Sequence, residues 1–198
     1  LGEGGAVATN DSELNKIILS LRDWGRDCWC KAGRDNTCLK RFDHKLGDVP
    51  YDHKYIYSQI GYNLKPIEFQ AAMGIEQLKK IDKFNSIRKN NYKIFKEEFS
   101  QFDKHLELPE INEGADPIFF GLPIMIINDK VERQKLVRFL NENKIGTRFL
   151  FGGNLLKQPA YKSINHKVYQ DLDYTNKVMK NLFWIGIHPG INEEIIKY

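Results

Sequence analysis

Long hydrophobic runs are missing from this 198-residue chain. The longest apolar stretch, 119–127, is interrupted by Gly121 and Pro123 and is far too short to span a bilayer. No signal-peptide pattern opens the sequence. We therefore expect a cytoplasmic protein that has no membrane partner.

A strong charge of either sign is also missing. The 30 basic and 26 acidic side chains leave a formal net charge of +4, and no basic run is interleaved with stacking aromatic residues. Nucleic-acid-binding domains typically carry such a basic surface, so we expect no nucleic-acid partner. Internal repeats and low-complexity tracts are absent as well. A hydrophobic share of 41% nevertheless suffices for a packed core.

Cysteine is scarce, yet all three cysteines lie within one short loop. Cys28, Cys30 and Cys38 are spaced C-x-C-x₇-C. Their odd number fits a reducing compartment better than a disulfide framework. Between positions 22 and 45, seven basic side chains outnumber four acidic ones, and such a surplus favours thiolate over thiol. Thiolates bind metal ions, and nearby cations stabilise the negative charge of an iron–sulfur cluster.

Two interpretations of this loop stay open on spacing alone. One is a metal or cluster site, and the other is a set of three free cysteines, two of them half buried. Structural zinc and iron–sulfur sites normally take four protein ligands. The fourth ligand then comes from His44, from His53, from another chain or from sequence outside this one. Considered alone, His44, His53 and His188 are expected to be partly exposed surface histidines.

The first half of the chain combines a strand, helices and one long loop. The expected elements are a strand over 7–9, an amphipathic helix over 12–24, an irregular aromatic loop over 39–60, and helical patterns over 66–81 and 84–102. Asn10-Asp11-Ser12 is the N-cap signal of the first helix, and Pro66 suits the first turn of the second. Because the sequence opens at Leu1 directly inside a structural element, we expect a fragment of a longer protein.

The second half alternates strands and helices. The expected elements are strands over 119–127, 147–151 and 184–188, and helices over 131–143 and 177–183. This order indicates an α/β or α+β subdomain that begins near Pro117.

Several motifs carry a resemblance to a known family. They are, in chain order, Gly2-Glu3-Gly4-Gly5-Ala6-Val7 with Thr9-Asn10, Leu21-Arg22-Asp23 with Gly25-Arg26, and Gly61-Tyr62-Asn63 with Gln70-Ala71-Ala72. In this order and spacing they resemble the DegT/StrS family of vitamin B6-dependent sugar aminotransferases, over essentially the whole chain. The segments 23–30, 35–38, 145–154 and 183–186 resemble its CDP-4-keto-6-deoxyglucose 3-dehydrase branch, which also occurs in lipopolysaccharide O-antigen operons.

The resemblance implies a fold class and a domain division. The fold class is α/β, as the C-terminal part of a fold-type I enzyme like aspartate aminotransferase. Residues 1–80 are then the end of the cofactor-binding large domain with the cysteine loop, 81–116 a long helix and connector, and 117–198 the small C-terminal domain. The same resemblance implies a homodimer.

The resemblance also implies an activity. Enzymes of this branch remove the C3 hydroxyl of a nucleotide-linked 4-keto-6-deoxyhexose, with pyridoxamine 5′-phosphate in place of lysine-bound pyridoxal 5′-phosphate. A 2Fe–2S cluster relays electrons from a flavin/iron–sulfur NADH-dependent reductase. The implied products are 3,6-dideoxysugars of the O-antigen.

The family pattern assigns roles to a few residues of this chain. Cys28, Cys30 and Cys38 match three cluster ligands, and the fourth is implied upstream of the chain. Asn63 matches an amide that reaches the cofactor phosphate of the neighbouring subunit, and helix capping near Pro66 is the less favoured alternative. Asn154 and His188 fall near the implied substrate site. The catalytic histidine of the branch is implied before Leu1, so no catalytic residue is expected here.

Two other functions remain as alternatives. A sugar aminotransferase of the same family needs no cluster, and the cysteine triplet disfavours it because transamination uses no thiols. The triplet disfavours a cluster-free dehydratase for the same reason. The other alternative is a zinc-stabilised interaction module without catalysis, and the family motifs argue against it.

Overall fold

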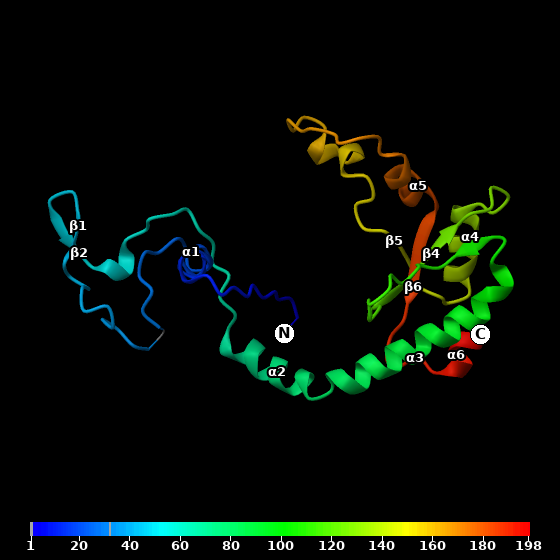
Figure 1. Ribbon diagram of the computed structural model, residues 1–198, viewed down its shortest axis with the longest axis horizontal. Coiled ribbons are helices and arrows are strands. Elements are labelled where there is room, and N and C mark those ends of the chain that lie inside the picture. Colours follow the sequence, from blue (N-terminus) through cyan, green and yellow to red (C-terminus); the bar gives the residue numbers. More distant parts are fainter. Residues whose placement is uncertain (1, 32) are drawn as a thin grey trace. The chain divides into compact units, whose positions relative to one another are not determined.

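The computed structural model describes residues 2–31 and 33–198, which form two compact units, Leu1–Lys79 and Lys80–Tyr198. The first unit contains α1 (Ser12–Arg22), β1 (His44–Leu46), β2 (Val49–Tyr51), the 3₁₀ turn η1 (His53–Tyr55) and α2 (Glu68–Leu78) (Figure 1). No helix in the described part of the chain is long and apolar enough to cross a membrane.

Helix α1 begins at an acidic cap, as the sequence predicts. Asp11 has extended backbone dihedrals, and its Oδ1 accepts hydrogen bonds from the Glu13 and Leu14 amides at 2.9 and 3.0 Å. These bonds satisfy two amides that have no partner inside the helix. The helix ends at Arg22, two residues before the expected end, and the chain then enters the cysteine loop.

The loop over 39–60 is more regular than expected. Strands β1 and β2 form an antiparallel hairpin in which Leu46 pairs with Val49. Gly47 connects them with a φ of 60°, which suits the first position of a tight hairpin turn. The dipeptide Gly47-Asp48 is a recognised hairpin signal, so the sequence already indicated a hairpin at this position.

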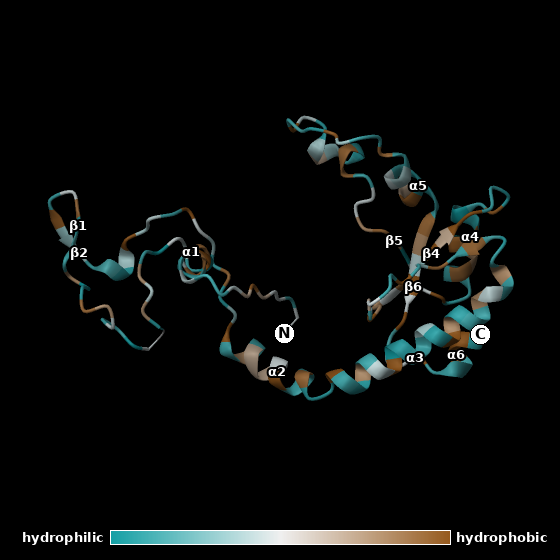
Figure 2. Cartoon of the chain, in the orientation of Figure 1, coloured by the Kyte–Doolittle hydropathy of each residue, from teal (hydrophilic) through white to brown (hydrophobic). Residues whose placement is uncertain are grey.

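Helix α2 leaves its apolar side chains uncovered. It buries none of its residues, and Phe69 and Ile75 are exposed by 70% and 59%. Figure 2 shows hydrophobic residues along this helix. The described residues of the first unit therefore leave these side chains largely uncovered.

The second unit is built on an antiparallel sheet. Its elements are α3 (Ile81–Phe99), η2 (Ser100–Phe102), β3 (Leu106–Glu107), β4 (Gly121–Ile126), α4 (Arg133–Glu142), β5 (Thr147–Phe149), η3 (Leu155–Lys157), η4 (Pro159–Tyr161), α5 (Asp173–Asn181), β6 (Leu182–Gly186) and α6 (Glu193–Lys197). The strand order is β3-β4-β6-β5, and every neighbouring pair is antiparallel.

The hydrophobic core lies in this second unit. Leu122 and Ile124 of β4 and Phe183 of β6 are at most 1% exposed, and they form one cluster with Tyr92 and Phe95 of α3. The apolar run that predicts a strand over 119–127 thus forms β4, one of the two central strands of the sheet.

Two further expected elements differ from the structure. The strand over 7–9 is absent: this segment has no ladder partner among the described residues, and Val7 is 74% exposed. A strand exists only when another backbone pairs with it, which alternation alone cannot supply. The helix expected over 177–183 instead spans Asp173–Asn181, and its last expected residues belong to β6. The division into 1–80, 81–116 and 117–198 stays a prediction.

Candidate functional site

The three cysteines line one pocket in the first unit. Cys28, Cys30 and Cys38 border a cavity of about 530 Å³, and each is a free, half-buried thiol. Six basic side chains share its wall: Arg22, Arg26, Lys31, Arg41, Lys54 and Lys65. Their positive charge favours thiolates and any anionic group that the thiolates hold.

A tight backbone turn positions the cysteine loop. Gly25 has a φ of +82°, and a Cβ there would lie 1.8 Å from the Gln59 carbonyl oxygen. The Gly25 carbonyl accepts hydrogen bonds from the Ser58 and Gln59 amides at 3.0 and 3.2 Å. The Asp27 amide then donates to the Ile56 carbonyl at 2.9 Å. Only glycine permits this approach, which ties the start of the loop to residues 56–59.

Neighbouring thiols occupy opposite environments. A hydrogen bond from Thr37, with smaller contributions from Cys38 and Cys28, lowers the pKa of Cys30 to about 7. Burial raises the pKa of Cys28 above its ordinary value. Cys30 is therefore better prepared than Cys28 to bind a metal ion near neutral pH.

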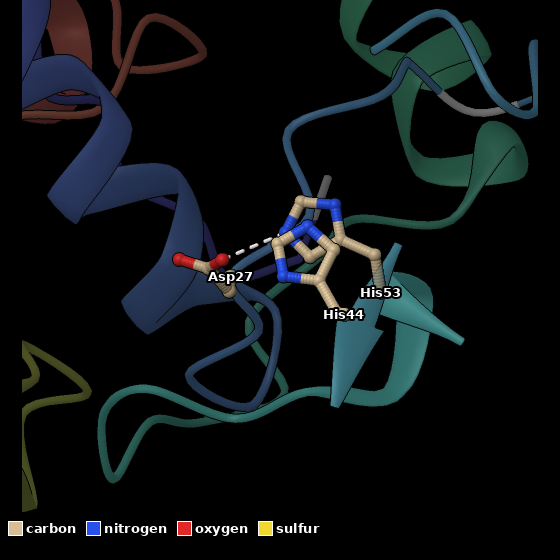
Figure 3. A group of neighbouring side chains, drawn as sticks. All are labelled: Asp27, His44 and His53. Atoms are coloured by element: carbon tan, nitrogen blue, oxygen red, sulfur yellow. Dashed lines mark hydrogen bonds and ion pairs between the residues drawn. The ribbon is translucent and has the colours of Figure 1, made fainter. Parts of the chain in front are cut away.

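A buried histidine lies beside the thiols. The His53 side chain is 1% exposed, its Nε2 lies 2.7 Å from Asp27 Oδ2, and its Nδ1 lies 3.8 Å from Cys38 Sγ. Figure 3 shows the His44 ring overlying that of His53, with centroids 3.9 Å apart and planes inclined by 14°. The expectation of a partly exposed surface histidine is wrong for His53, because loop closure turns this ring inward.

Salt bridges hold Arg41, Lys54 and Asp35, which line the pocket. Arg41 donates from its Nε and from one terminal nitrogen to Asp52 Oδ2 at 2.9 and 2.7 Å, and Lys54 pairs with Asp35 at 2.8 Å. The hydrogen bond from Arg41 lowers the pKa of Asp52, and the one from Lys54 lowers the pKa of Asp35. Both carboxylates thus stay charged and keep the loop closed near neutral pH.

Asn63 is exposed, and its backbone bridges to Asp23. It does not cap α2: the cap is Ile67, whose amide donates to Gln70 Oε1 at 3.0 Å. The capping alternative for Asn63 is therefore wrong. No described residue forms a hydrogen bond with its side-chain amide, which leaves the amide open to a ligand.

The two residues expected near a substrate lie in the second unit. Asn154 is 5% exposed, donates to Asn176 Oδ1 at 2.9 Å and accepts from the Leu156 amide at 3.0 Å, so both ends of its amide have partners. His188 is exposed, and its Nδ1 accepts from the Gly190 amide at 2.9 Å. Its Nε2 has no partner among the described residues.

The sequence model of the DegT/DnrJ/EryC1/StrS aminotransferase family matches residues 1–198. The chain belongs to this family. It is 49% identical to the lipopolysaccharide biosynthesis protein RfbH of Salmonella typhimurium, covering 100% of this chain and 46% of that protein. It is 46% identical to the dTDP-4-dehydro-2,6-dideoxy-D-glucose 3-dehydratase of Saccharopolyspora spinosa, covering 100% of this chain and 43% of that protein.

Solved structures of the family confirm the fold class. The E. coli GDP-4-keto-6-deoxy-D-mannose-3-dehydratase with bound hydrated PLP superposes with a TM-score of 0.76 at 28% identity, covering 96% of this chain and 47% of that chain. The chain spans less than half the length of these relatives. The resemblance stated on the motifs is confirmed together with the α/β fold.

Sequence reasoning missed one feature of this DegT-family chain. It placed His53 among the possible metal ligands but did not pair its ring with Asp27 and Cys38, which lie 26 and 15 residues away. The only available signal was that two histidines follow the cysteine loop closely. That signal does not specify which of the two rings turns inward.

Proposed function

We propose that the chain is the C-terminal part of an enzyme that removes the C3 hydroxyl of a nucleotide-linked 4-keto-6-deoxyhexose in 3,6-dideoxysugar and O-antigen biosynthesis. A CDP-linked hexose is the first substrate to test. The observation that carries the proposal is the pocket lined by three thiols in a basic wall. Plain transamination has no use for such thiols, and relatives at 46% and 31% identity are named 3-dehydratases.

The proposed cofactors are pyridoxamine 5′-phosphate, related to pyridoxal 5′-phosphate, and a 2Fe–2S cluster. When bound, they supply an electron-withdrawing ring that labilises the C3 hydroxyl and a carrier of single electrons. Cys28, Cys30 and Cys38 would hold the cluster from this chain, and the fourth ligand would come from sequence outside it. The donor set fits, because soft thiolates suit iron and Cys30 has a pKa of about 7.

The remaining residues bind and orient in this proposal. The basic pocket wall stabilises the negative charge of the cluster, and Arg26 and Lys31 help to dock an acidic face of a flavin/iron–sulfur NADH-dependent reductase. In a homodimer, Asn63 donates its amide hydrogen to the phosphate of the partner's cofactor. His188 is a better substrate contact than Asn154, because its Nε2 is open while the Asn154 amide is engaged.

Cys30→Ser in the full-length, anaerobically prepared protein tests the proposal. A protonated hydroxyl is a poor iron ligand, so the variant should lose most cluster absorbance and most bound iron. It should still bind pyridoxamine phosphate, and it should fail to release a 3-deoxy product with NADH and a reductase. Absorption spectra, iron and sulfide content and product analysis measure the three results.

Lys40→Gln is the matched control, because it lies in the same loop, removes a charge and keeps every thiol. This variant should retain the cluster and should still form the 3-deoxy product. Production of the 3-deoxy sugar by Cys30→Ser at the parent's rate would reject the proposal. A parent protein with a cofactor band and no iron would instead favour the aminotransferase alternative. A featureless spectrum with bound zinc would favour the non-catalytic module.

A further inference from the structure

We propose that His53 is a positioning residue for Cys38, and that Asp27 fixes the His53 ring. The ring holds and orients the Cys38 sulfur within the three-thiol set and supplies a hydrogen bond to it. This inference rests on the proposed function, because the effect is exerted on an iron–sulfur cluster. It concerns a residue that is not itself a ligand in that proposal.

Both nitrogens of His53 have defined partners. Nε2 lies 2.7 Å from Asp27 Oδ2, and Nδ1 lies 3.8 Å from Cys38 Sγ. The side chain is 1% exposed, so water does not compete for either nitrogen. A buried polar ring is retained in a fold when its nitrogens are satisfied, and here the two partners satisfy it from opposite sides.

The surrounding loop locks the position of this ring. Its backbone amide donates to the Arg41 carbonyl at 2.7 Å, and Trp29 meets the ring edge-on with centroids 5.4 Å apart. His44 covers one face at 3.9 Å. The backbone of His53, the edge of its ring and one face of the ring are therefore held by three different residues. The ring has little freedom to turn away from Cys38.

The chemistry of an iron-bound thiolate decides the direction of the hydrogen bond. A thiolate has no hydrogen to give, so His53 Nδ1 carries the hydrogen and donates it to the Cys38 sulfur. Nε2 lies 2.7 Å from Asp27 Oδ2, and this contact fixes the plane of the ring so that Nδ1 faces the sulfur. Hydrogen bonds to ligand sulfurs help to set the reduction potential of a cluster, because they stabilise the extra negative charge of the reduced state.

A separate metal site at the histidines is less favoured by the geometry. One ligand atom each of Asp27, His44 and His53 lies within 4.8 Å of the others. The two rings are nearly parallel, however, with planes inclined by 14°. A ring nitrogen directs its lone pair in the ring plane, so two stacked rings do not direct their lone pairs at one ion. The stack instead supports His53 as part of the wall around Cys38.

The test compares variants of the full-length, anaerobically purified protein. His53→Phe keeps the ring size and removes both nitrogens, His53→Gln keeps a polar group, and Asp27→Asn weakens the fixation of the ring. His44→Phe is the matched control, because it preserves the stack without touching the Cys38 contact. The midpoint reduction potential and the iron content per chain are measured for each, with circular dichroism as the check on folding.

We expect a more negative midpoint potential in His53→Phe, a smaller shift in the same direction in His53→Gln and Asp27→Asn, and none in His44→Phe. A parental potential in a folded, iron-loaded His53→Phe would overturn the inference. Should His53→Phe misfold, His53→Gln and Asp27→Asn decide by the same criterion. A second result would also overturn the inference: the folded His53 variants lose iron while Asp27→Asn keeps the parental potential. His53 would then be a ligand of the cluster. A parent without iron would reject the proposed function itself, and the inference with it.

Discussion

At the scale of single residues, two neighbouring thiols show how position controls reactivity. Cys28 and Cys30 are separated by one residue, yet burial raises the pKa of the first and hydrogen bonding lowers that of the second. A C-x-C motif thus contains one thiol that is ready to bind or react at neutral pH and one that is protected. The difference arises from Thr37, which the chain brings back to Cys30 from seven positions away.

Thr37→Val should slow the alkylation of Cys30 at pH 7 in the reduced, metal-free chain. The Thr37 hydrogen bond is the largest cause of the lowered pKa of about 7, so its loss raises the pKa and leaves less thiolate. The rate should fall by about 2- to 5-fold, since a rise of roughly half to one pKa unit lowers the thiolate fraction at pH 7 by that factor. Iodoacetamide labelling between pH 6 and 9, with peptide mapping, measures the profile.

Thr37→Ser retains the hydroxyl and is the control, with a Cys30 profile like that of the parent. The labelling rate of Cys28 should change little in either variant, because burial is the first cause of its pKa. An identical Cys30 profile in Thr37→Val and the parent would show that another group ionises this thiol.

At the scale of elements, one arginine joins α3 to both central strands, β4 and β6, at the same end of their ladder. Arg88 donates to the Phe119 carbonyl just before β4 at 3.1 Å and to the Ile187 carbonyl just after β6 at 3.2 Å. These carbonyls lie just beyond the end of the ladder at which Gly121 pairs with Gly186, so strand pairing does not satisfy them. The charged side chain supplies both missing donors, and the helix is thereby held on the sheet.

Arg88→Met should lower the free energy of unfolding of the second unit by about 1.5–3 kcal/mol, the usual range for hydrogen bonds to a charged group. Methionine keeps much of the aliphatic packing and removes the donors. Urea unfolding followed by the fluorescence of Trp184, which lies in β6, measures the change.

Lys89→Met gives the comparison for Arg88→Met. Lys89 pairs with Asp116 in an exposed salt bridge, and such pairs contribute about 0–1 kcal/mol. A destabilisation by Lys89→Met as large as that by Arg88→Met would show that the loss of charge, and not the loss of the two carbonyl contacts, is responsible.

At the scale of the whole molecule, the two units differ in how much they bury. The buried apolar core belongs to the second unit, whereas the described residues of the first unit leave large apolar side chains exposed, among them Ile60 at 97% and Phe69 at 70%. Exposed apolar patches mark surfaces that contact other protein. In the proposed homodimeric enzyme, the first unit therefore acts together with surfaces that the described residues do not supply.

Asn63→Ala should weaken cofactor retention in the full-length protein. Loss of one hydrogen bond to a charged phosphate costs about 1.5–3 kcal/mol, which corresponds to roughly a ten- to hundred-fold weaker affinity. The dissociation constant of pyridoxamine phosphate measures it, and iron content should stay unchanged because the thiols are intact.

Asn112→Ala removes an exposed amide from the second unit and serves as the control, with parental affinity expected. The amide of Asn63 has no phosphate contact if Asn63→Ala retains the cofactor as tightly as this control.

The sequence alone determined the features that depend on neighbouring residues. Helical periodicity and the Asp11 cap located α1, and the run around Leu122 located the central strand β4. The cysteine spacing with the family motifs identified the thiol loop. Each of these signals acts over a few residues, so it can be read without knowing the fold.

Only the tertiary structure decided which distant groups meet. It brought His53 to Asp27 and Cys38, used the Asn154 amide to cap a turn, and left the segment 7–9 without a strand partner. Such contacts arise when loops close and bring together residues that are far apart in sequence. Local propensity does not specify where a closed loop directs a side chain, which is why the buried histidine became visible only in three dimensions.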